Sequence, residues 1–242
     1  LLSAKPYDAI YVGFPGNLSV VAARLVSRKP IYFDAFISLY DTYVHDRKSV
    51  SPQSFASKWY RLLDSVACRL ADTVIVDTQL HAEYFSRELH IPREKFAVIL
   101  VSTDVAIFRP LEHGERKAGF SVFWHGKYSA LHNVRFILDA FALLKNEPAY
   151  QLYLLGSGGE QYSSVREQVN SQNLNNVHFL DTVAYEELPK RIASADVCLG
   201  VFGESNKVDR VVPNKVYEYM ACGKVVITRE SSACRSVLTG AE

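Results

Sequence analysis

Short apolar runs alternate with stretches of helical period along the whole of this 242-residue chain. Apolar runs of about four to eight residues are typical of buried strands, and parallel strands need a crossover connection that is usually a helix. The alternation therefore predicts an α/β protein built on parallel sheets. The predicted strands are residues 8–13, 31–34, 73–76, 96–100, 120–124, 151–155, 177–180, 196–201 and 224–228.

Two of the intervening stretches have a clear apolar face. In SPQSFASKWYRLLDSVACRLA, residues 51–71, large apolar side chains recur at helical spacing, and we expect this face to lie in the core. It carries Phe55, Trp59, Leu62, Leu63, Val66 and Leu70. The stretch LHNVRFILDAFALLK, residues 131–145, repeats the arrangement through Val134, Ile137, Leu138, Phe141 and Leu144.

Nine strands exceed the usual content of one sheet, and the polar stretch FRPLEHGERKAG separates the fourth from the fifth. We therefore expect two Rossmann-like, doubly wound domains facing each other across a cleft, residues 1–110 and 111–242. The chain begins with Leu a few residues before a strand and stops after an amphipathic stretch. We expect it to be an internal fragment of a longer protein, with both domains incomplete.

Composition excludes several classes of protein. The chain is 48% hydrophobic and 22% charged, with a formal net charge of +1, which disfavours disorder and non-specific nucleic-acid binding. Neither a run of about 20 apolar residues nor a signal peptide is visible, so a cytoplasmic location is the simplest interpretation. The four cysteines (Cys68, Cys198, Cys222 and Cys234) are widely spaced and lie mostly in apolar runs. We expect core thiols, without a disulfide framework or metal site.

In parallel sheets, ligands bind beyond the carboxyl ends of the strands, which singles out four loops of the second half. These loops are HGKYSALHN, GSGGEQY, DTVAYEEL and FGESNKVDRVVPNK. Gly156 and Gly158 in GSGGEQY allow a tight turn into a helix whose free N–H groups favour an anion. A plain strand-to-helix turn explains this segment equally well.

Several of these segments together resemble a known family. VHFLDTVAYEELPKRIASADVCLGVFG followed by VPNKVYEYMACGKVVIT is similar to the donor-binding domain of the retaining, nucleotide-sugar-dependent glycosyltransferases of family four, which have the two-domain GT-B fold. HGKYSALHNVRFILDAFALLK, YLLGSGG and VSTDVAIFRP occur in the family's order. The resemblance runs from about Asp72 to the C-terminus, and the first 70 residues are less diagnostic.

The resemblance implies roles for particular residues. Glu218, in YEYMACGKVVI, matches the glutamate that binds the ribose hydroxyls of the donor, and a carboxylate suits a vicinal diol. Pro213, Asn214 and Lys215 match the helix start that faces the diphosphate. Lys127, directly after Gly126, matches a basic residue of the donor site. His132 stands where a second basic residue is usual, and Asn133 where a glycine is usual. The expected donor-binding set is Gly126, Lys127, His132, Gly156, Gly158, Thr182, Val183, Asn214, Lys215 and Glu218.

The chain departs from the family at Arg210, which occupies the usual position of a second glutamate. Either an acidic neighbour such as Glu204 or Asp209 binds the sugar, or Arg210 binds the diphosphate, or the chain belongs to a branch without that glutamate. We favour the last interpretation, in which Lys207, Arg210 and Lys215 surround the leaving diphosphate. Such charge stabilisation needs no metal.

The N-terminal half is expected to bind the acceptor. In IYFDAFISLYDTYVHDR, Asp34 at the predicted strand end and Asp41 in the following loop are the best candidates for an acceptor or sugar hydroxyl. Turn formation or helix capping explains both at least equally well. With Lys127 and Arg210, they complete the set of expected catalytic residues.

The resemblance implies a glycosyltransferase that moves a sugar from a nucleotide-diphosphate-sugar, used as co-substrate without a further cofactor, to a saccharide or lipid-linked acceptor with retention of configuration. Polysaccharide or glycolipid biosynthesis would be its setting. A sugar-nucleotide epimerase of the same fold and a non-catalytic nucleotide-sugar-binding subunit remain alternatives. Peripheral attachment at the inner face of a membrane is an expectation from the family only, because the apolar face around Trp59 is better explained by the core.

Overall fold

A computed structural model of the chain describes residues 6–111 and 119–238, and it divides into two compact units. The first unit comprises residues 1–100, 209–211 and 232–242, and the second comprises 101–208 and 212–231. Within the described residues, all nine predicted strands are confirmed, two with the predicted bounds and seven with small shifts at their ends. Most of the polar segment proposed as the domain boundary, residues 112–118, lies outside the described residues.

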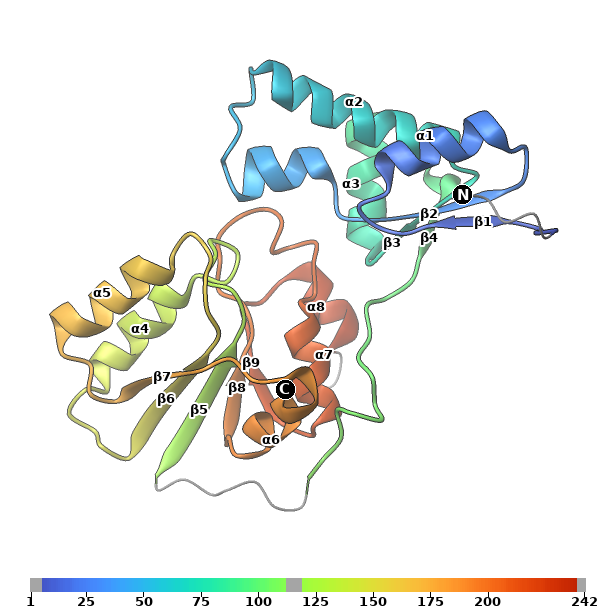
Figure 1. The fold of residues 1–242 in the computed structure, drawn as a ribbon. Coiled ribbons are helices and arrows are strands. Elements are labelled where there is room, and N and C mark those ends of the chain that lie inside the picture. The colour runs from blue at the N-terminus through green and yellow to red at the C-terminus, as the bar shows by residue number, and fades with distance from the viewer. Residues whose placement is uncertain (1–5, 112–118, 239–242) are drawn as a thin grey trace. The chain divides into compact units, whose positions relative to one another are not determined.

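The first unit is built on a parallel four-stranded sheet in the order β1-β2-β3-β4 (Figure 1). Its strands are β1 (Ile10–Val12), β2 (Ile31–Phe36), β3 (Thr73–Val76) and β4 (Phe96–Val98), and its helices are α1 (Asn17–Val26), α2 (Phe55–Leu70), α3 (Gln79–Leu89) and α8 (Ser232–Val237). Two short helical turns, η1 (Asp41–Asp46) and η2 (Arg93–Lys95), complete it. Side chains that alternate along the strands, such as Ile31, Phe33 and Val74, form one core with α1, α2 and α3. Tyr11 and Tyr32, on intervening positions, are exposed.

The expected core face of α2 is wrong for three of its six residues, while Leu70 packs against the core. Phe55, Trp59 and Leu62 are 82%, 45% and 50% exposed, whereas the buried residues of this helix include Ser57, Asp64, Ala67 and Cys68. Small side chains let α2 approach its neighbours closely, and the carboxylate of Asp64 can be buried because it accepts hydrogen bonds from Asn17, Ser38, Leu39 and Tyr40. The core therefore does not explain the apolar side chains Phe55, Trp59 and Leu62 on this helix.

The second unit holds a parallel five-stranded sheet in the order β7-β6-β5-β8-β9. Its strands are β5 (Phe120–His125), β6 (Tyr150–Leu155), β7 (Val177–Leu180), β8 (Val197–Leu199) and β9 (Val225–Ile227), and its helices are α4 (Val134–Leu143), α5 (Tyr162–Gln172), η3 (Tyr185–Glu187), α6 (Leu188–Ala193) and α7 (Asn214–Ala221). One core cluster joins the sheet to α4 and α5, and another joins it to α6 and α7. Helices thus cover both faces (Figure 1), and the chain reverses its direction of strand addition between β5 and β8.

The fold is therefore α/β with two parallel sheets, as predicted. All four cysteines are buried and unpaired by disulfides, in keeping with core thiols. No helix of the described chain is long and apolar enough to span a bilayer. Within residues 6–111 and 119–238, His, Cys, Asp and Glu side chains form no cluster suited to a metal ion.

Candidate functional site

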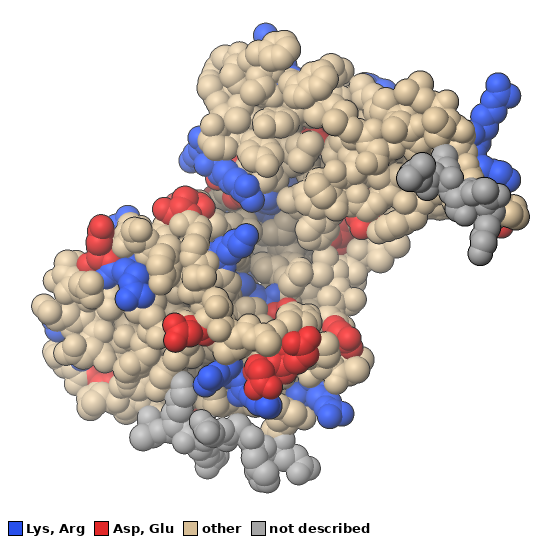
Figure 2. Space-filling view, viewed as in Figure 1, with Lys and Arg blue, Asp and Glu red and all other residues tan. Residues whose placement is uncertain are grey.

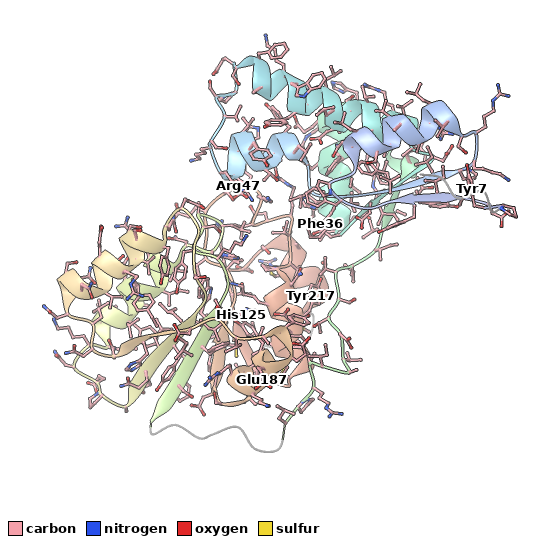
Figure 3. All side chains as sticks on the ribbon, in the orientation of Figure 1. Tyr7, Phe36, Arg47, His125, Glu187 and Tyr217 are labelled. Atoms are coloured by element: carbon pink, nitrogen blue, oxygen red, sulfur yellow. The ribbon has the colours of Figure 1, made fainter. Side chains whose placement is uncertain are left out.

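The reversal between β5 and β8 marks the place in a doubly wound sheet where the loops after two neighbouring strands diverge and leave room for a ligand. His125 is the last residue of β5, and Figure 3 shows it at the end of that strand. The loop after β8 leads to Pro213 and then into α7. The end of β5 and the start of α7 therefore define the candidate site in the second unit.

Three polar side chains meet there, two of them buried and one partly buried. Lys215 and Glu218, one turn apart on α7, are 5% and 6% exposed. His125 Nε2 lies 3.0 Å from Glu218 Oε2, within ion-pair distance, and the His125 side chain is 14% exposed. Within the described residues, Lys215 Nζ is buried without a hydrogen-bond partner. Because an unpartnered buried polar atom costs about 1–3 kcal/mol, this amine indicates a place prepared for a ligand.

The environment of the Lys215 amine is aromatic rather than acidic. Its Nζ lies 4.3 Å from the centre of the Trp124 ring, which is itself fully buried. Burial lowers the pKa of Lys215 from 10.5 to about 7, although the Glu218 carboxylate acts in the opposite direction. Lys215 is thus poised between its neutral and charged forms near neutral pH.

The two histidines beside Lys215 are held neutral. Burial is the main cause that lowers the pKa of His125, partly offset by Glu218. Burial and the Lys215 charge lower the pKa of His132 to about 3. His132 was expected to supply a second positive charge to the donor site, but in this structure it is a neutral ring whose Nδ1 contacts the carbonyl of Lys127.

Gly126 permits the close approach of Lys215. A Cβ atom at this position would lie 2.9 Å from Lys215 Nζ, and the backbone φ of +143° is one that other residues rarely adopt. Gly156, in the loop after β6, packs its backbone against Gly126, and a Cβ there would lie 2.1 Å from the Gly126 carbonyl oxygen. Gly156 therefore lets the loop after β6 pack against the loop after β5.

The start of α7 presents backbone donors. Pro213 is the N-cap residue and has no side-chain acceptor to offer, and Asn214 is the exposed first residue of the helix. The free N–H groups of a first turn, together with the helix dipole, favour an anion. This helix start and the Lys215 amine belong to the same turn of chain.

The remaining expected donor residues lie in the loops after β5, β6 and β7. Lys127 is exposed in the loop after β5, and Thr182 is exposed in the loop after β7. Val183 packs against the core beside α6. Gly158 adopts a left-handed backbone and accepts a hydrogen bond from the Tyr128 N–H, which ties its loop to the one after β5. Asn133, at φ +46°, shows why a glycine is usual in its place.

Arg210 belongs to the first unit, whereas Lys215 and Glu218 belong to the second. Its Nη2 is 2.8 Å from Asp41 Oδ2, in an ion pair whose side chains are 13% and 4% exposed. Its guanidinium also stacks over the Tyr84 ring, and its backbone carbonyl accepts a hydrogen bond from Thr78. The structure thus brings together Asp41 and Arg210, two of the four residues expected to be catalytic.

Asp34 differs from its expected place. Strand β2 continues to Phe36, so Asp34 lies within the strand and not at its end. Its carboxylate accepts a hydrogen bond of 2.7 Å from the exposed Tyr11 hydroxyl. The loop that follows carries Asp41 and runs from Phe36 toward Arg47, both labelled in Figure 3.

Two contributors were missed at the sequence level. His125 opens the loop HGKYSALHN but was assigned no role in the site. A histidine at the last position of a strand, directly before a glycine, points toward the ligand edge of the sheet and could have been recognised by that. Asp64 was assigned no role, yet its carboxylate fixes the backbone of the Asp41 loop through Leu39 and Tyr40. A single acidic residue in a helix carries no pattern that predicts this.

Comparisons with known proteins show the family and the fold. The family described as glycosyl transferases group 1 matches residues 119–242, which is half of the chain, and the chain therefore belongs to that family. No curated protein matched.

The fold is shared with solved glycosyltransferase structures of the GT-B type. Anabaena HepE in complex with UDP and glucose is 20% identical with a TM-score of 0.73, and the match covers 96% of this chain and 61% of that chain. Sucrose-phosphate synthase from Thermosynechococcus elongatus is 18% identical with a TM-score of 0.77, and the match covers 96% and 58%. The pneumococcal O-GlcNAc transferase GtfA in complex with UDP and GlcNAc is 14% identical with a TM-score of 0.65, and the match covers 93% of this chain and 43% of that chain. The chain thus spans less than two thirds of each of these proteins.

Proposed function

We propose that the second unit binds a nucleotide-diphosphate-sugar and that the protein transfers the sugar with retention of configuration, as a family-four glycosyltransferase. The observation that carries the proposal is the buried, unpartnered Lys215 amine beside the start of α7. A diphosphate there would receive both a cation and backbone N–H donors, the two features that favour phosphate in proteins.

The other groups of the donor follow from this placement. Glu218 and His125 would contact the ribose, because the Glu218 carboxylate can accept hydrogen bonds from a diol and His125 lies directly beside that carboxylate. Lys127 would reach the diphosphate from the loop after β5. Thr182 and Val183, after β7, would border the base or ribose.

The chemistry would be charge stabilisation of the departing diphosphate. As the bond from the sugar carbon to the phosphate oxygen breaks, negative charge grows on that oxygen, and fixed positive groups lower the barrier. Lys215 and Lys127 supply such charge. Asp34, Asp41 and Arg210 are proposed to serve the acceptor, a saccharide or lipid-linked hydroxyl, and the proposal requires no metal.

A lipid-linked acceptor is supported by one surface of the first unit. Phe55, Trp59 and Leu62 are exposed on α2, with the exposed basic residues Lys58 and Arg61 between them. Apolar side chains flanked by cations favour an anionic membrane surface. Elsewhere charges are mixed, and Figure 2 shows acidic and basic side chains interspersed on the second unit rather than one extended basic surface.

A binding experiment tests the proposal. Thermal shifts with UDP, GDP, ADP and their sugars should show stabilisation by at least one nucleotide, because a ligand that binds only the folded state raises the midpoint. Lys127→Ala and Glu218→Gln should weaken this binding at least tenfold. Lys190→Ala removes another exposed lysine of the same unit, one that pairs with Glu187, and is the control.

The outcomes separate the alternatives. If no nucleotide shifts the transition, or if Lys127→Ala and Lys215→Ala leave affinity and turnover unchanged, the donor site is wrongly placed. Binding without transfer to any acceptor would favour the non-catalytic subunit. Conversion of the donor sugar without transfer would favour the epimerase.

A further inference from the structure

The Lys215 amine lies at a place where no hydrogen-bond acceptor meets it in the described chain. Its Nζ makes no hydrogen bond, the residue is 5% exposed, and the ring of Trp124 covers it at 4.3 Å. The carboxylate one turn away, Glu218, has His125 Nε2 3.0 Å from one of its oxygens. An ammonium here would have lost its water without gaining an acceptor, which is costly.

Resting on the donor site just proposed, we propose that Lys215 takes up a proton from solvent when the nucleoside diphosphate binds. In the free protein, the neutral amine is tolerated in its apolar surroundings. The bound diphosphate supplies the oxygens and negative charge that the ammonium lacks. The step is a simple association: one proton from the buffer forms an N–H bond with the lone pair of Nζ, and no other bond changes.

The groups facing Lys215 do not provide this charge themselves. From β5, His125 is neutral because burial lowers its pKa. From the loop before α4, His132 is neutral as well, with a pKa of about 3. From α7, Glu218 is the one acidic group among the causes that act on Lys215, and burial outweighs it, so that the pKa of Lys215 falls to about 7. A diphosphate in contact would raise that pKa again.

The proposal predicts a proton stoichiometry. At pH 8 the free protein holds Lys215 mostly neutral and the complex holds it charged, so binding should take up close to one proton per nucleotide. At pH 6 Lys215 is already mostly charged in the free protein, so its contribution to the uptake should be small, and any exchange that remains there belongs to the terminal phosphate of the nucleotide. Above pH 7, affinity should fall roughly tenfold per pH unit, because the proton must be acquired from an ever lower concentration.

Isothermal titration of the chain with UDP, with GDP and ADP in parallel, measures this stoichiometry. Each titration is run at pH 8 in HEPES and in Tris, whose ionisation enthalpies differ and which do not compete for a phosphate site, and the difference in observed heat gives the protons exchanged. Lys215→Met keeps the length of the side chain and should bind more weakly without proton uptake. Lys127→Ala removes an exposed lysine of the same site and should bind more weakly with the uptake retained.

The outcomes distinguish this inference from the proposed function. Binding without proton uptake at pH 8, or uptake that persists in Lys215→Met, overturns the proton linkage and leaves the donor site standing. Failure of UDP, GDP and ADP to bind at all overturns the donor site as well. If the methionine variant does not fold, the pH dependence of wild-type affinity decides, since a Kd that stays constant from pH 6 to pH 9 contradicts the proposal.

Discussion

Replacing Lys215 by methionine tests the buried amine without any ligand. The chain has two tryptophans, Trp124 in the second unit, fully buried, and Trp59 in the first unit, 45% exposed. In a Trp59→Phe background, the fluorescence of Trp124 therefore reports the unfolding of the unit that contains Lys215. The comparison is between this parent and its Lys215→Met derivative.

The expected magnitude follows from the pKa of Lys215, which burial lowers from 10.5 to about 7. Between these values the unfolded chain binds a proton at Lys215 that the folded chain does not. The free energy of unfolding therefore rises with pH in this window, by at most about 1.4 kcal/mol per pH unit. From pH 7 to pH 9 the gain is about 2 kcal/mol, and below pH 7 the full cost of charging the buried amine is present.

Urea denaturation at several pH values between 7 and 9 measures the effect. The methionine variant should be more stable than the parent at pH 7, because an apolar side chain of similar length avoids the cost of burying the amine. Its advantage should shrink by about 2 kcal/mol at pH 9. A difference between the two proteins that stays constant across this range would refute the argument that Lys215 is desolvated and loses its proton in the folded state.

Three further substitutions test the local structure by denaturant unfolding. Asp64→Ala removes the buried acceptor of four hydrogen bonds and should cost about 3 kcal/mol or more, whereas a cost below about 1 kcal/mol would show that these bonds do not hold the Asp41 loop. Arg210→Met leaves the buried Asp41 without its ion-pair partner and should lower the free energy of unfolding by about 3–5 kcal/mol. Adding Asp41→Asn should recover part of that loss, whereas additive effects of the two substitutions would argue against the ion pair. Asn133→Ala should be about 1 kcal/mol less stable than Asn133→Gly because of the positive φ, and equal stabilities would contradict the left-handed backbone.

The strands could be predicted because burial on both faces of a parallel sheet selects short, continuous apolar runs. The apolar run FSVFW illustrates this, since it leaves few alternatives to a central strand and β5 runs through it. The face of α2 could not be predicted in the same way. There, Asp64 is buried because hydrogen bonds satisfy it, while Phe55 is exposed. Hydrophobic periodicity takes no account of such partners.

In the candidate site as well, local patterns could be predicted and contacts between distant residues could not. Lys215 and Glu218 could be found because one motif carries both at a fixed spacing on one helix. His125 reaches Glu218 only through the fold, from a strand more than ninety residues earlier in the chain. The pairing of Arg210 with Asp41 is more distant still, and the sequence position of Arg210, close to the donor motif, suggested a different neighbour.

The most direct test of the donor site is a crystal structure of the chain with the nucleoside diphosphate that gives the largest thermal shift. The account predicts that diphosphate oxygens lie within about 3 Å of Lys215 Nζ and of the first backbone N–H groups of α7, with the ribose hydroxyls on Glu218. A nucleotide bound elsewhere, or one bound with the Lys215 amine still buried against Trp124 and without a phosphate partner, would contradict it.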